Sequence, residues 1–334
     1  MKYDAILWVS FGGPEKPDDI IPFLENVLRG KNVPRRRMMV VAEHYHHFGG
    51  RSPINHQNRQ MIKALEAELA ANGPQLPVYW GNRNWHPLLT DTMAKMKADG
   101  VRRALAFVTS AYSSYSGCRQ YLEDIARAQA AVGEGAPVID KIRPYYNHPG
   151  FVAAMTEQVQ QALEAIPAER RSATHLVYTA HSIPLSMANN CRYSEQLLEA
   201  CGLVSAALGR PTGPLVYQSR SGPPSQPWLG PDILEHLGEV GRTGQAKDVV
   251  IVPIGFVSDH MEVLFDLDTE ARQLCAELGL NMVRAAAVGT NPRFAVMVRE
   301  LVQERVNGKP ERPCLGTNGA CPDVCPSDCC LPRA

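Results

Sequence analysis

Four carboxylic acids gather in one short stretch of this chain, where they could hold a cation or pass protons. They follow a continuous apolar run, residues 248–254, and are Asp259, Glu262, Asp266 and Asp268. The apolar run is typical of a buried strand. Glu262 and Asp266 are four residues apart, so a helix would carry them on one face, where they repel each other without a cation. A solvated first helical turn is the simpler interpretation, because acids there suit the helix dipole.

A histidine stands at the end of a second predicted strand. Residues 174–180 form this strand, and His181 follows it, just before a turn that contains Pro184. Open α/β sheets bind ligands at the carboxyl ends of their strands. His181 alone could be a buried core imidazole. If the two strands are neighbours in one parallel sheet, however, His181 and Glu262 meet, and a neutral imidazole beside a carboxylate can accept a proton near pH 7.

Alternation of strands and helices predicts the architecture that positions these groups. One series of strands and helices covers residues 3–166, and a second covers residues 174–305. We expect an α/β fold of two similar doubly wound, Rossmann-like halves, each with a parallel four-stranded sheet, and an active cleft between them. The N-terminal half is expected over residues 1–168, the C-terminal half with His181 and Glu262 over residues 169–308, and a cysteine-rich extension over residues 309–334. Helices are expected over residues 59–71 and 268–278, among others.

The composition excludes several classes of function. The chain has 34 basic and 34 acidic residues in a length of 334, so its zero net charge gives no reason to expect nucleic-acid binding. No apolar run reaches the ~18 residues that cross a bilayer, and we recognise no signal peptide after Met1. Neither of the glycine-rich nucleotide motifs is present. We therefore expect a soluble cytoplasmic protein without a nucleotide cofactor.

Several motifs in combination resemble those of the ferrochelatases, the class II chelatases that insert ferrous iron into a porphyrin. They are T-A-H-S-I-P at 179–184, G-F-V-S-D-H-M-E-V-L-F-D-L-D at 255–268, F-G-G-P at 11–14, G-G-R-S-P-I at 49–54 and Q-S-R-S-G-P-P at 218–224. The resemblance covers residues 3–305. It implies that His181 and Glu262 are the catalytic groups and meet the Fe²⁺ substrate, with Asp266 and Asp268 extending the acidic line. Whether His181 first meets iron or protons stays open.

Resemblance to the Gram-positive type implies coproporphyrin III as the substrate and coproheme as the product. Its carboxylates would be bound by Arg29, Ser52 and Tyr121, with Tyr45 near Arg29. Phe11 would pack on the ring face, at a position where many relatives have a tyrosine that can ligate the product iron. The alternatives are a protoporphyrin IX ferrochelatase, a cobalt or nickel chelatase, and a non-catalytic haem or iron carrier of the same fold. Transient contact with neighbouring haem-pathway enzymes is a further expectation.

Five of the nine cysteines lie in the last 21 residues. Their spacing lacks the C-x2-C pairs of a zinc site, whereas iron–sulfur clusters accept more irregular spacing. Some ferrochelatases carry a 2Fe-2S cluster with three ligands in a C-terminal extension and one in the body. The resemblance implies such a cluster here, with the ligands Cys118, Cys314, Cys321 and Cys325. Cys329 or Cys330 could replace Cys325, and Cys191 could replace Cys118. A tail of free thiols is the simpler interpretation.

Overall fold

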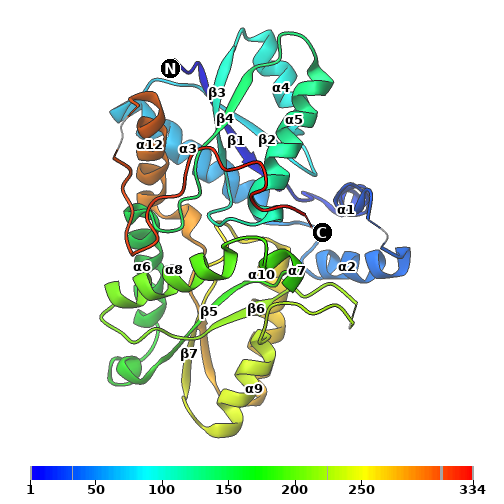
Figure 1. The fold of residues 1–334 in the computed structure, drawn as a ribbon. Helices are drawn as coiled ribbons and strands as arrows, with labels where there is room; N and C mark the ends of the chain where they lie inside the picture. The colour runs from blue at the N-terminus through cyan, green and yellow to red at the C-terminus, as the bar shows by residue number, and fades with distance from the viewer. Residues whose placement is uncertain (1, 32, 224, 309–310, 333–334) are drawn as a thin grey trace.

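The chain folds into two α/β halves, one above the other in Figure 1. The computed structural model describes residues 2–31, 33–223, 225–308 and 311–332. All strand pairs are parallel, in the order β2-β1-β3-β4 in the first sheet and β6-β5-β7-β8 in the second. The first sheet consists of β1 (Ala5–Ser10), β2 (Val78–Asn82), β3 (Arg103–Val108) and β4 (Val138–Lys141), and the second of β5 (His175–His181), β6 (Leu215–Gln218), β7 (Asp248–Val252) and β8 (Asn281–Arg284). The predicted fold class is confirmed.

Helices cover both faces of each sheet, as buried parallel strands require. In the first series they are α1 (Ile20–Leu28), α2 (Arg35–His47), α3 (Ile54–Asn72), α4 (Leu89–Ala98), α5 (Gln120–Val132) and α6 (Pro149–Glu164). In the second they are α7 (Leu185–Ala188), α8 (Tyr193–Ala207), α9 (Ile233–Thr243), α10 (Met261–Val263), α11 (Arg272–Glu277) and α12 (Pro292–Val306). Two π-helical segments, η2 (Tyr115–Arg119) and η4 (Leu264–Ala271), precede α5 and α11. Single 3₁₀ turns complete the series: η1 (Pro17–Asp19), η3 (Ala168–Ala173) and η5 (Val288–Thr290). None of the helices in the described ranges is long and apolar enough to cross a membrane.

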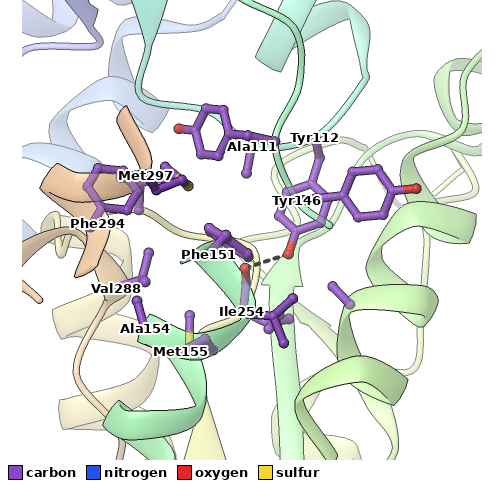
Figure 2. Packing of buried hydrophobic residues seen from close by; sticks show 14 of the residues in the cluster. Ala111, Tyr112, Tyr146, Phe151, Ala154, Met155, Ile254, Val288, Phe294 and Met297 are labelled. Carbon is purple, nitrogen blue, oxygen red and sulfur yellow. Dashed lines mark hydrogen bonds between the residues drawn. The ribbon is translucent and has the colours of Figure 1, made fainter. Parts of the chain in front are cut away.

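An apolar core continuous between the halves holds them together. Figure 2 shows side chains from both series packed in one cluster, and the Tyr112 hydroxyl donates a hydrogen bond of 2.9 Å to the Ile254 carbonyl. The last helix, α12, returns to the first half, where Phe294 packs edge-on against Phe107 and Tyr145. The halves are therefore fixed relative to each other by burial of apolar surface.

Two helical segments differ from the sequence expectation. No element was assigned to α2 from the sequence, and this helix begins with three arginines and buries only Met38, Ala42 and Tyr45 against α1. The helix expected over residues 268–278 instead starts at Met261 and passes through the π-helical turn. The start is early because the buried side chains of Val263 and Leu267 bring the acid-rich stretch onto the core.

The C-terminal tail, described over residues 311–332, lies against the two halves through polar contacts. The backbone carbonyl of Asn147 accepts a hydrogen bond from the Leu315 N–H group. The side-chain amide of Asn147 donates a hydrogen bond to the Gly319 carbonyl. On α8, the Glu199 carboxylate accepts hydrogen bonds from the backbone N–H groups of Thr317, at 2.8 Å, and Asn318, at 3.0 Å. Burial acts to raise the pKa of Glu199, but a hydrogen bond of 2.7 Å from the Tyr146 hydroxyl, together with these two backbone bonds, lowers it.

Glu199→Gln is expected to loosen the tail, because a neutral amide accepts weaker hydrogen bonds than a carboxylate does. Limited thermolysin digestion, followed by mass spectrometry, should show cleavage before Leu315, which lies beside the Glu199 contacts, several-fold faster than in the wild type. The matched control is Glu195→Gln on the same helix, whose carboxylate is paired with Arg192. Equal cleavage rates in the two variants would show that Glu199 does not anchor the tail.

Candidate active site

One large cleft between the halves brings the predicted catalytic and binding residues together. Its volume is about 1190 Å³, and side chains from both halves line it. His181 and Glu262 lie on the C-terminal side, and the five substrate-binding candidates Phe11, Arg29, Tyr45, Ser52 and Tyr121 all line the same cavity. The expected cleft between the two halves is present, and all seven of these residues line it.

His181 and Glu262 form a pair at the carboxyl ends of neighbouring strands. His181 is the last residue of β5, and Glu262 lies in α10, which follows β7, the strand paired with β5. The His181 Nε2 atom is 3.6 Å from Glu262 Oε2. The His181 Nδ1 atom contacts the Ser182 carbonyl, so Nδ1 carries the proton and Nε2 is free to accept one.

His181 and Glu262 each shift the pKa of the other. Burial alone would lower the pKa of His181, but the Glu262 carboxylate outweighs burial and raises it. Burial would likewise raise the pKa of Glu262, but His181, and after it His260 and Lys31, hold that pKa at about 2. An imidazole beside a permanently ionised carboxylate can accept a proton and hold it as a stabilised cation.

A second imidazole, His260, was missed by the sequence analysis as a functional residue. Its Nδ1 atom is 3.8 Å from the same Glu262 Oε2 atom, so two histidines flank one carboxylate oxygen. Burial lowers the pKa of His260 despite the nearby carboxylate, which keeps this ring neutral at pH 7. The signal was present in the sequence, because His260 precedes Glu262 by only two residues. Two imidazoles and one carboxylate therefore lie close together, although among the described residues they are not arranged as ligands of a single metal ion.

The four acids that follow β7 divide into two pairs, Glu262 with Asp266 and Asp259 with Asp268. Asp266 lines the cleft with Glu262 and accepts hydrogen bonds from Ser219 and Gln218. Burial raises the pKa of Asp266 to about 7, and the Glu262 charge adds to this rise. The prediction that Asp268 extends the acidic line is corrected.

Arg284 forms ion pairs with Asp268 and Asp259, and these pairs keep Asp268 out of the acidic line of the cleft. Its guanidinium lies 2.8 Å from Asp268 Oδ2 and 3.0 Å from Asp259 Oδ1, so it neutralises both acids beneath the cleft wall. Arg284 is sixteen residues beyond Asp268 and belongs to β8, the strand next to β7. The sequence pattern of the acids alone gives no sign of this pairing.

The N-terminal half supplies an aromatic wall with hydrogen-bond donors. Phe23 is in edge-to-face contact with Phe11 and Tyr45. The Arg83 guanidinium lies 4.5 Å from the Tyr121 ring centroid and is paired with Asp124. Burial raises the pKa of Tyr45 and of Tyr121, so both hydroxyls stay protonated and can donate. Such a wall suits a flat aromatic ligand with polar substituents.

The cysteines do not form one group. Cys325 and Cys330 lie near Cys118, and the Cys329 and Cys330 sulfur atoms are 3.4 Å apart. Burial raises the pKa of Cys325 to about 12, and the thiols of Cys329 and Cys118 add to it. Cys321, in contrast, is buried beside Gln196, whose amide donates to its sulfur at 3.5 Å. Among the residues that the structure describes, no three histidine, cysteine or acidic side chains are grouped to hold a metal ion.

Comparison with known sequences decides the family. The sequence profile of the family described as Ferrochelatase matches residues 3–306. The chain belongs to the ferrochelatase family. A ferrochelatase of Rhodopirellula baltica is 60% identical over 98% of this chain and 93% of its own length. A coproporphyrin III ferrochelatase of Streptomyces coelicolor is 52% identical over 99% of this chain and 94% of its own.

Solved structures show the same fold at low sequence identity. SirB from Bacillus subtilis with Fe³⁺ matches with a TM-score of 0.58 and 11% identity, over 91% of this chain and 96% of that one. CbiX, described as the terminal enzyme for biosynthesis of siroheme in denitrifying bacteria, matches with a TM-score of 0.51 and 15% identity, over 90% of this chain and 98% of that one. These likenesses show the fold alone, which this ferrochelatase shares with other chelatases.

Proposed function

We propose that this ferrochelatase inserts Fe²⁺ into coproporphyrin III and releases Fe-coproporphyrin III, or coproheme. The observation that carries the proposal is the pairing of His181 with Glu262 on one side of a cleft whose other side is aromatic and rich in donors. Further support is that relatives about 50% identical over the full chain, from Streptomyces coelicolor and Nocardia farcinica, are coproporphyrin III ferrochelatases.

In the proposed reaction a free-base porphyrin gives up its two pyrrole protons and receives one Fe²⁺. His181 Nε2 accepts the two pyrrole protons in turn, because Nδ1 is committed to the Ser182 carbonyl, and it releases the first proton toward solvent before it takes the second. The Glu262 carboxylate stabilises the resulting imidazolium and, with His181, faces the iron on the same side of the ring. The cleft's aromatic wall contacts the macrocycle, and Asp266, with a pKa near 7, is placed to pass protons outward.

The four carboxylates of coproporphyrin III require donors. Arg29, Ser52, Tyr45 and Tyr121 line the cleft on the N-terminal side and are proposed to bind them. Protoporphyrin IX has only two carboxylates and is the alternative substrate. Anaerobic insertion rates with each porphyrin distinguish the two. We expect kcat/KM to be at least tenfold higher with coproporphyrin III, and a preference for protoporphyrin IX would overturn the substrate assignment while leaving the chemistry in place.

Phe11→Tyr is expected to alter the product complex. Phe11 lines the cleft on the half opposite His181, so a phenol there would face the other side of the ring and could ligate product iron. We expect a shift in the visible spectrum of bound coproheme and slower product release than in the Phe11→Leu control. Identical spectra in both variants would place residue 11 away from the metal.

The cysteines fit a 2Fe-2S cluster by donor chemistry, and we propose that the tail and Cys118 hold one. Iron–sulfur clusters take thiolate ligands, and Cys325 and Cys330 lie near Cys118, with Cys329 beside Cys330. Cys314 and Cys321 remain candidates, and their thiols would have to approach Cys118 for the set Cys118, Cys314, Cys321 and Cys325 to hold the cluster. A bound cluster would supply one-electron redox chemistry, and no step of iron insertion passes through it.

Metal analysis of anaerobically purified protein tests the cluster without any activity assay. We expect about two iron and two sulfide ions per chain, together with visible absorption before substrate is added. Cys118→Ser should lose both, whereas Cys275→Ser, at a buried position in α11, should keep them. Protein that contains neither iron nor sulfide would leave the tail as a segment of free thiols.

We also propose a cytoplasmic location and transient contact with neighbouring haem-pathway enzymes. The support for the location is that all nine cysteines are free thiols in the structure, which suits a reducing compartment. Transient contacts would hand over a product that is poorly soluble. Crosslinking in cell extract, with and without bound porphyrin, tests these contacts.

A further inference from the structure

A pair of imidazoles lies at the opposite end of β5 from the catalytic histidine. His175 begins the strand and His181 ends it, so the two are about 20 Å apart at ~3.3 Å per residue. The side chain of His175 points to the same face as Val177, which packs against α9. His236 of α9 lies on that helix's sheet-facing stripe, one turn after Ile233. The pair therefore sits at the rim of an otherwise apolar interface.

The two rings converge through the nitrogen atoms that could bind metal. The Nε2 atoms of His175 and His236 are 3.0 Å apart, and the ring planes are 28° apart with centroids at 5.3 Å. Metal–imidazole bonds are about 2.1 Å long, and two such bonds to nitrogens 3.0 Å apart subtend about 90°. That angle is the one between adjacent ligands of an octahedron, and it is narrower than a tetrahedral ion prefers.

Both rings are available to a cation. Burial lowers the pKa of His175, with a further contribution from His236, and burial lowers the pKa of His236. Neutral imidazoles keep a lone pair for a metal. Both side chains are half-buried, so solvent still reaches the pair. A direct hydrogen bond uses the Nε2 proton of one ring and the Nε2 lone pair of the other, whereas a metal ion would use both lone pairs.

We propose that His175 and His236 form a binding site for an octahedral divalent transition-metal ion, separate from the iron-insertion site. Within the described residues the pair has no third histidine, cysteine or acid grouped with it, so water fills the remaining positions. Imidazole nitrogen suits Fe²⁺, Co²⁺ and Ni²⁺, and their preference for six ligands matches the right angle. The inference stands whether or not coproporphyrin III is the substrate.

Nickel binding tests the proposal on the intact protein without porphyrin. Equilibrium dialysis should show that His175→Gln and His236→Gln each bind one Ni²⁺ fewer than the wild type, and that the double variant loses no more than either single one. His56→Gln is the matched control, because that histidine is exposed on α3 and far from the pair in sequence. Wild-type stoichiometry in both single variants would overturn the site.

Wild-type protein provides a measurement that does not depend on the variants folding. Paramagnetic Ni²⁺ at substoichiometric concentration should broaden the imidazole resonances of His175 and His236 at lower concentration than that of His56. Equal broadening of all three resonances would mean adventitious binding and would contradict the proposal. Iron insertion by His236→Gln is expected to stay within twofold of the wild type, and a greater loss would contradict the separation of the two sites.

Discussion

Glu262→Gln is expected to lower kcat for iron insertion at least about 100-fold while porphyrin binding stays within a few-fold of the wild type. The substitution keeps the size of the side chain and removes its charge. The carboxylate that raises the pKa of His181 is then lost, and the imidazolium formed when His181 accepts a proton has no counter-charge. Stopped-flow absorbance under anaerobic conditions gives the rate, and quenching of porphyrin fluorescence gives the affinity.

The matched control is Glu270→Gln. Glu270 is on the π-helical segment η4, which directly follows the α10 turn of Glu262, but it is exposed and does not line the cleft. We expect Glu270→Gln to retain the wild-type rate. Normal turnover by Glu262→Gln, or an equal loss in both variants, would remove Glu262 from the catalytic assignment.

Glu304→Gln is expected to lower the free energy of unfolding by about 3–5 kcal/mol. Arg143 is fully buried, and its guanidinium donates two hydrogen bonds of 2.9 Å to the Glu304 carboxylate of α12. Removal of one partner's charge leaves the other buried without compensation. Because Arg143 also donates to the Pro313 carbonyl, the same change should release the start of the tail. Urea unfolding followed by circular dichroism measures the effect.

Glu300→Gln is the control for this prediction. Glu300 lies on the same helix and is half-buried, 3.8 Å from His148, whose pKa is lowered by burial to about 3 so that the ring is uncharged. We expect the free energy of unfolding of the Glu300→Gln variant to stay within about 0.5 kcal/mol of the wild type. If the two variants are equally stable, the buried ion pair is not what holds α12 to the first half.

The strands and the catalytic pair could be predicted because local pattern determines them. Continuous apolar runs mark β1, β3 and β7, whose residues are almost all buried. His181 ends β5, and Glu262 lies in α10, ten residues beyond the end of β7, so parallel pairing of β5 with β7 brings the two to the same edge of the sheet. Each of these inferences needs only neighbouring residues and the general rule for parallel sheets.

The features that could not be predicted depend on partners distant in the chain. Asp268 is removed from the acidic line by Arg284, which arrives from another strand. The helix α2 has a weak apolar stripe that local pattern alone does not identify, because its burial depends on contact with α1. His44 of α2 stacks on Phe265 of η4 with ring centroids 3.6 Å apart, a contact across the cleft that no local pattern indicates. The positions of the tail cysteines likewise depend on the surface against which the tail lies.

Single-turnover iron insertion into coproporphyrin III by the wild type and by His181→Ala tests the central claim most directly. The account predicts that both proteins bind the porphyrin, and that only the wild type converts the free-base spectrum into that of the metalloporphyrin on anaerobic addition of Fe²⁺. Insertion by His181→Ala at the wild-type rate would contradict the assigned base. Tight binding of the porphyrin by the wild type without any insertion would contradict the assignment of the protein as an enzyme and would favour a carrier of the same fold.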